Sequence, residues 1–160
     1  LIPNPTPFIG VTGGRNSVPS VLDLNQDGQM DLLVGNFLGH IREYHQINNG
    51  DAPHFKLERR QFLNLDVGLG AVPRIADLNN DSFPDLVIGS DRGRLVNFQL
   101  KTEEKAVNVM QWKLKEGYFD KLNLPVGGAP VFEDMDFDGD LDMVIGTENG
   151  TLEYYRNLGR

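Results

Sequence analysis

The chain of 160 residues repeats itself three times. Alignment on Asp23, Asp77 and Asp134 gives repeat lengths of 54 and 57 residues, and it holds well outside these acidic positions. In every unit a proline lies four residues before the aspartate, and two glycines four residues apart follow it: Pro19, Pro73 and Pro130, then Gly35, Gly89 and Gly146, then Gly39, Gly93 and Gly150. Such spacing predicts a fold built from copies of one supersecondary unit.

Each unit contains short segments with the character of β-strands. A first strand opens at the proline, which strands tolerate at their first position, and a second is apolar on both faces, as expected for a buried inner strand. A third alternates in polarity, and a fourth is more polar, which suits a sheet rim. Examples are 20–22 for the first strand, 32–34 for the second and 150–155 for the third. The fourth strand is expected at 54–59 in unit 1 and at 107–112 in unit 2. We expect the two glycines to bracket a tight turn, because glycine adopts positive φ freely.

Four strands in a unit of about 50 residues match the size of a β-propeller blade. The sequence therefore predicts an all-β segment over 1–160, with three four-stranded antiparallel blades at about 18–64, 72–124 and 129–160. The third unit stops after its third strand, so residues 4–12 are expected to act as a closing outer strand. Because propellers close with roughly four to eight blades, we expect further blades in the same parent protein or a homo-oligomer.

A nine-residue acidic loop joins the first two strands of every unit. Side-chain oxygens stand at loop positions 1, 3, 5 and 9, and a backbone carbonyl is expected to serve at position 7. Two carboxylates ~4 Å apart repel by roughly 4 kcal/mol at an effective dielectric of ~20, so a cation is needed, and oxygen ligands suit Ca²⁺. We expect up to three Ca²⁺, held by Asp23, Asn25, Asp27, Gln29, Asp31, Asp77, Asn79, Asp81, Phe83, Asp85, Asp134, Asp136, Asp138, Asp140 and Asp142.

A helix-loop-helix calcium site would need a bidentate Glu at loop position 12. That position holds Val34, Ile88 and Ile145, which are apolar and belong to the second strand. We therefore expect the aspartate at position 9 to close the cage within a β-hairpin. The second loop departs most from the pattern, since Ser82 replaces the glycine of the other two loops.

With these residues the chain resembles the FG-GAP or VCBS repeat family, the calcium-bearing blades of integrin alpha-chain propellers and of many bacterial surface and secreted proteins. The resemblance rests on 130–142, on Gly146 and Gly150, on their equivalents, and on the sequence Gly128-Ala129-Pro130. It implies Ca²⁺ bound in the hairpin between the first two strands of each blade. The Phe-Gly pairs of the family are missing here.

Charge and composition exclude several kinds of partner. The formal net charge of −8 argues against nucleic acid and anionic lipid, although three Ca²⁺ would cancel six of these charges. Apolar runs fall short of the ~20 residues of a membrane helix, so we expect no membrane insertion. There is no Cys for a disulfide or a thiolate metal site. Open oxygen cages work where Ca²⁺ is near millimolar, so we expect an extracytoplasmic location: secreted, periplasmic or at the cell surface.

The sequence favours a non-catalytic structural, adhesion or protein-interaction scaffold that holds a protein or glycan ligand. The loop oxygens are all used as ligands, which leaves no open metal position to activate water, so we expect no enzyme activity. Two alternatives stay open: a lectin-like propeller with pockets between blades, and an accessory subunit or domain of a secreted enzyme or larger complex. Packing is favoured over sugar stacking for Tyr44, Trp112, Tyr154 and Tyr155, and solvation or capping over zinc binding for His40, His45 and His54.

Overall fold

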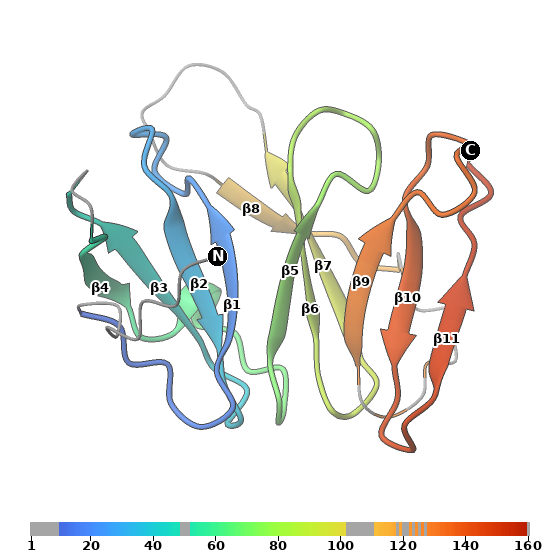
Figure 1. Ribbon diagram of the computed structural model, residues 1–160, viewed down its shortest axis with the longest axis horizontal. Coiled ribbons are helices and arrows are strands. Elements are labelled where there is room, and N and C mark those ends of the chain that lie inside the picture. The colour runs from blue at the N-terminus through green and yellow to red at the C-terminus, as the bar shows by residue number, and fades with distance from the viewer. Residues whose placement is uncertain are drawn as a thin grey trace.

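The structure is a computed structural model that describes residues 10–48, 52–101, 111–117, 119, 122, 124, 126 and 128–159. Its strands form three antiparallel sheets that stand side by side across the molecule (Figure 1). The described residues also include one 3-10 turn, η1 (Phe62–Asn64), and contain no helix long and apolar enough to cross a membrane. The predicted all-β class is confirmed.

The three sheets, which we call blades 1, 2 and 3, each run as a meander in which every strand pairs with the next along the chain. Blade 1 consists of β1 (Val18–Leu22), β2 (Asp31–Gly35), β3 (Ile41–Gln46) and β4 (Phe55–Arg59). Blade 2 consists of β5 (Val72–Ala76), β6 (Asp85–Gly89), β7 (Leu95–Lys101) and β8 (Gln111–Leu114). Blade 3 consists of β9 (Ala129–Glu133), β10 (Asp142–Gly146) and β11 (Leu152–Tyr155).

The first strand of each blade begins one residue earlier than predicted, so its proline stands at the second position. Pro19 lies inside β1, Pro73 inside β5 and Pro130 inside β9. These strands lie at the edge of their sheets, where a missing N–H group costs no ladder hydrogen bond.

Two predicted outer strands fall partly outside the described residues. The strand expected at 107–112 appears as β8, Gln111–Leu114, and residues 107–110 are not described. Of the expected closing strand at 4–12, only 10–12 is described. There Val11 packs against the apolar cluster on blade 1, and the Thr12 carbonyl accepts a hydrogen bond of 2.8 Å from the Tyr44 hydroxyl.

The core lies between the sheets. Leu33 and Ile41 of blade 1 pack against Leu86, Ile88 and Phe98 of blade 2. On the other side of blade 2, a second cluster consists of Leu78, Val87, Phe119 and Met143. Blades 1 and 2 therefore bury both faces of their second strands, which explains the uninterrupted apolar runs there, whereas Val144 of β10 is only half-buried.

The paired glycines do bracket the turn, but only the second of each pair has the positive φ that was expected of both. Gly39, Gly93 and Gly150 have φ of 83°, 70° and 83° and do form the turn. Gly35 and Gly89 are instead the last residues of β2 and β6, where a Cβ atom would lie 2.1 Å from the carbonyl oxygen of Ala71 and 1.8 Å from that of Gly128. These two glycines allow the backbone of the next blade to approach.

Candidate metal centre

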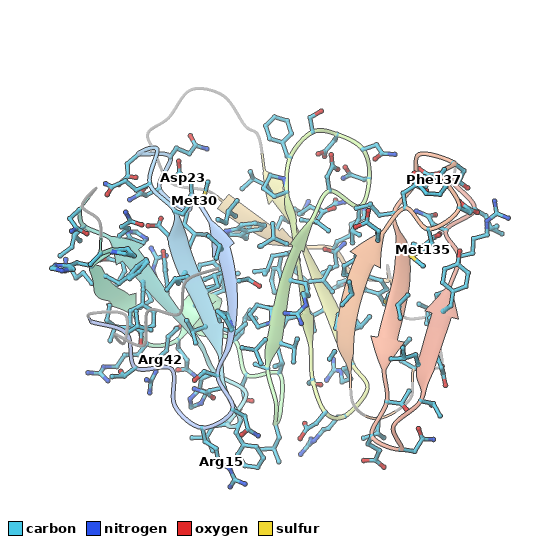
Figure 2. The ribbon with its side chains drawn as sticks, in the orientation of Figure 1. Arg15, Asp23, Met30, Arg42, Met135 and Phe137 are labelled. Carbon is cyan, nitrogen blue, oxygen red and sulfur yellow. The ribbon has the colours of Figure 1, made fainter. Side chains whose placement is uncertain are left out.

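The three acidic loops join the first two strands of each blade and lie at one end of the molecule. Figure 2 shows Asp23 of the first loop and Phe137 of the third at this end, with Arg15 at the opposite end. Loops 2 and 3 also touch, because Asn80 Nδ2 lies 2.9 Å from Asp140 Oδ1 and 3.2 Å from the carbonyl oxygen of Gly139. The repeat thus places its oxygen-rich segments together.

The loops share one backbone conformation. Loop positions 4 and 6 have positive φ in all three copies: 58° at Gln26, 56° at Asn80 and 61° at Phe137, then 85° at Gly28, 69° at Ser82 and 95° at Gly139. The second loop keeps this conformation although Ser82 is not a glycine. Its departure in sequence therefore does not change its fold.

Backbone N–H groups hold the carboxylates in the same way in each loop. In loop 1, the Asp23 carboxylate accepts hydrogen bonds from the N–H groups of Asp27 at 3.1 Å and Gly28 at 2.9 Å. The Asp27 carboxylate accepts one from the N–H of Gln29 at 2.8 Å. The equivalent bonds recur in loops 2 and 3. Backbone N–H groups thus fix the carboxylates at positions 1 and 5 of every loop.

Loop 3 brings three carboxylates closest together. One oxygen from each of Asp134, Asp136 and Asp138 lies within 4.8 Å of the other two. Loops 1 and 2 carry Asn25 and Asn79 at position 3, and the Oδ1 atom of each accepts a 3.0 Å hydrogen bond from the N–H at position 5. A set made only of carboxylate, amide and carbonyl oxygens fits a hard cation such as Ca²⁺.

The aspartate at position 9 is the most deeply placed carboxylate of each loop. The exposed fractions of Asp31, Asp85 and Asp142 are 0%, 2% and 1%. Their Oδ2 atoms accept the N–H of position 2 at 3.0, 3.0 and 3.3 Å. In blades 1 and 3 the Oδ1 atom also accepts an N–H: from Gln46, the last residue of β3, at 2.9 Å, and from Asn157, just beyond β11, at 2.8 Å. These residues tie the loop to the sheet, a role that sequence reasoning did not assign.

The surroundings of these three aspartates move their pKa values in different directions. Burial raises the pKa of Asp31, and burial with the charges of Asp81 and Asp77 raises the pKa of Asp85 to about 6. The pKa of Asp142 is lowered, chiefly because the Tyr154 hydroxyl donates a 2.7 Å hydrogen bond to it. The same bond raises the pKa of Tyr154 to about 12.

Arg156 also enters the third loop from the end of β11. Its Nε lies 2.5 Å from Asp136 Oδ2, and its Nη2 lies 3.2 Å from Asp138 Oδ2. The hydrogen bond to Asp138 and the charge of Asp136 raise the pKa of Arg156. The contacts of Arg156 and Tyr154 with the loop were not predicted from the sequence, because the prediction of the loops used what the repeats share and these residues occur in one unit.

The aromatic and histidine residues considered in the sequence analysis lie in different parts of the molecule. Tyr44 is buried and Trp112 packs against the core between blades 1 and 2, as the preference for packing predicted. His45 Nε2 lies 2.8 Å from Oε1 of the buried Glu43. A cavity of about 680 Å³ opens beside β11, and Phe119, Tyr154 and Tyr155 contribute to its wall.

Comparison with known proteins supports the repeat. A family model described as an FG-GAP-like repeat matches residues 23–88, from the start of the first acidic loop to the penultimate residue of β6. The predicted resemblance is confirmed over this segment. No curated protein matches the chain.

Proposed function

We propose that this chain, which carries an FG-GAP-like repeat over residues 23–88, is a calcium-stabilised β-propeller module. It acts outside the cytoplasm as a non-catalytic scaffold that presents a binding surface to a protein or glycan partner. Its acidic loops hold one Ca²⁺ each, and the ion locks the hairpin between the first two strands of the blade.

The observation that carries the calcium proposal is the shared geometry of the loops. Three segments separated by more than fifty residues adopt the same backbone and turn carboxylates inward with the same N–H donors. Carboxylates held this close repel one another in the absence of a cation. Ca²⁺ would remove that repulsion, with positions 1, 3, 5 and 9 and the carbonyl at position 7 as its ligands.

The scaffold proposal rests on the face of blade 3 that points away from blade 2. Leu24 and Leu78, at loop position 2, are 5% and 7% exposed because the next blade covers them, whereas the equivalent Met135 is 54% exposed. Ile41 is buried in the same way, whereas its equivalent Leu152 is exposed. This face therefore has the positions of an inter-blade surface, and the described part of the chain places no blade against it.

Polar contacts to the next blade are likewise present in blades 1 and 2 and missing at the equivalent position of blade 3. Ser20 Oγ donates a 2.7 Å hydrogen bond to the carbonyl of Pro73, and Arg74 Nε donates one of 2.9 Å to the carbonyl of Pro130. The third unit has Val131 at this position, and its side chain is exposed. The free face is thus apolar, and contact with further blades or with a second copy of the chain would bury it.

Light scattering over a range of protein concentrations tests the assembly. We expect the chain to self-associate through the free face and Leu152→Lys to shift it towards monomer, because a charge there would be buried. Leu38→Lys, at an exposed leucine of blade 1, is the control and should leave the mass unchanged. A wild-type chain that stays monomeric at every concentration would contradict association between copies.

The cavity beside β11 supports a second candidate function, that of a carbohydrate-binding module. Tyr154 and Tyr155 offer ring surfaces that could stack on a sugar, and Lys115 and Glu116 add polar groups to the wall. Glycan-array binding that Tyr155→Ala abolishes would favour this function. Unchanged binding in that variant, or no binding by the wild-type chain, would count against it.

A further inference from the structure

Arg156 is a feature of the third loop that its repeat partners lack. It stands at the same distance from the loop start as His45 in unit 1 and Gln99 in unit 2. His45 contacts Glu43 in its own strand. Only the third unit places a permanently charged guanidinium at this position.

The third loop is also the most acidic of the three. It carries five aspartates, whereas each of the other loops carries three. Without a cation its carboxylates would repel most strongly, and Arg156 provides a positive charge at Asp136 and Asp138. The acidic excess and the arginine therefore occur in the same unit.

We propose that Arg156 is an internal competitor of calcium, whose guanidinium holds the third loop in the ion-free state and must leave before Ca²⁺ binds there. This inference rests on the proposed function, that the loop binds calcium. Asp136 and Asp138 are both predicted ligands, and the oxygens that face the guanidinium would have to turn to the ion. Among the described residues, no salt bridge reaches a carboxylate of loop 1 or loop 2.

The exposure of Arg156 makes this exchange feasible. Its side chain is 52% exposed, so the guanidinium can turn into water without being buried elsewhere. Partly exposed ion pairs are worth roughly 0.2–1 kcal/mol each, so loss of two such pairs should raise the calcium affinity of loop 3 about two- to thirtyfold. Salt screens these pairs, so the effect should shrink as ionic strength rises.

Calcium titrations followed by amide NMR can separate the loops. Gly28 and Gly139 occupy position 6 of loops 1 and 3, and each donates its N–H to the carboxylate at position 1. In Arg156→Gln we expect the calcium midpoint of Gly139 to fall about two- to thirtyfold while that of Gly28 stays unchanged. Arg156→Lys keeps the charge without the forked geometry, so its Gly139 midpoint should lie between the two.

The control for net charge is Arg15→Gln. Arg15 is exposed, lies over the ring of Phe37 and stands at the opposite end of the molecule from the loops (Figure 2). The Arg15→Gln substitution should leave the calcium midpoints of Gly28 and Gly139 unchanged. A second check repeats the wild-type and Arg156→Gln titrations in about 0.5 M KCl, where the difference between them should narrow.

The outcomes separate this inference from the proposed function. Saturable calcium shifts at Gly139 with the same midpoint in wild type and Arg156→Gln would overturn the inference and leave the calcium site intact. Shifts that appear only in Arg156→Gln would support it. An absence of calcium shifts at Gly139 in both proteins would contradict calcium binding by loop 3, and the inference would fall with it.

Discussion

Gly89 and Gly128 bring the backbones of blades 2 and 3 so close that no side chain fits between them. A Cβ atom at Gly89 would lie 1.8 Å from the Gly128 carbonyl oxygen. Gly35 meets Ala71 in the same way between blades 1 and 2. A Cβ atom at the equivalent Gly146 would meet only the Leu152 side chain, at 4.0 Å, because blade 3 has no described neighbour on that side. The position is therefore constrained only where a next blade is present.

Gly89→Ala should destabilise the chain by about 2–3 kcal/mol, because the new methyl group forces two backbones apart. Gly146→Ala is the matched control and should change the unfolding free energy by less than about 1 kcal/mol, since alanine in a strand mainly lowers the backbone entropy of the unfolded chain. Urea unfolding of both variants measures the difference. Equal losses in the two variants would argue that Gly89 matters to its own strand and not to blade packing.

The backbone at position 6 of each loop has positive φ, which strains any residue other than glycine. Gly139 has φ of 95°, and a Cβ atom added there would have no neighbour within 4 Å, so Gly139→Ala should cost about 1–2 kcal/mol through conformation alone. Ser82 already bears part of that strain at φ of 69°, so Ser82→Gly should be neutral or stabilising by up to about 1 kcal/mol. Thermal melts in EDTA check both. A destabilised Ser82→Gly would show that the serine side chain supports the loop.

Much of this fold could be predicted because the repeat supplies three views of one unit. The shared prolines, aspartates and apolar runs placed the first two strands of each blade and the loop between them to within one or two residues. The role of Gly35 and Gly89 could not be predicted, because a glycine before a hairpin looks the same whether it is needed for a turn or for a neighbouring backbone. The contacts of Arg156 with Asp136 and Asp138 were missed for a related reason: an alignment of repeats shows common residues, and the fold joins positions that differ between units.

Asp85 predicts a pH dependence in calcium-free buffer. Its pKa is raised to about 6, mainly by burial and also by the charges of Asp81 and Asp77, and it stands above the ordinary value of 3.8. An acid with a raised pKa in the folded state binds its proton more tightly in that state than in the unfolded chain. Protonation of Asp85 therefore adds to the free energy of unfolding. This contribution is complete below about pH 4 and is lost as the pH rises through about 6.

The free energy of unfolding of wild type and of Asp85→Asn, measured in EDTA as a function of pH, tests this dependence. Between about pH 7 and pH 5, wild type should gain stability relative to the variant, because asparagine cannot take up the proton. With Ca²⁺ present the trend should reverse, since protons then compete with the ion for the carboxylate. Parallel pH profiles of the two proteins in EDTA would contradict the assignment.

A thermal melt of the chain, in Ca²⁺ and then in EDTA, is the decisive measurement of calcium binding by the acidic loops. With dissociation constants near 10⁻⁴ to 10⁻³ M and a tenfold excess of ion, each site should add roughly 1.4 kcal/mol. Three sites should raise the midpoint by roughly 8–16 °C in a chain of this size, and Asp138→Ala should remove about a third of the increase. An identical midpoint with and without calcium, or an Asp138→Ala variant that responds as the wild type does, would contradict calcium binding by these loops.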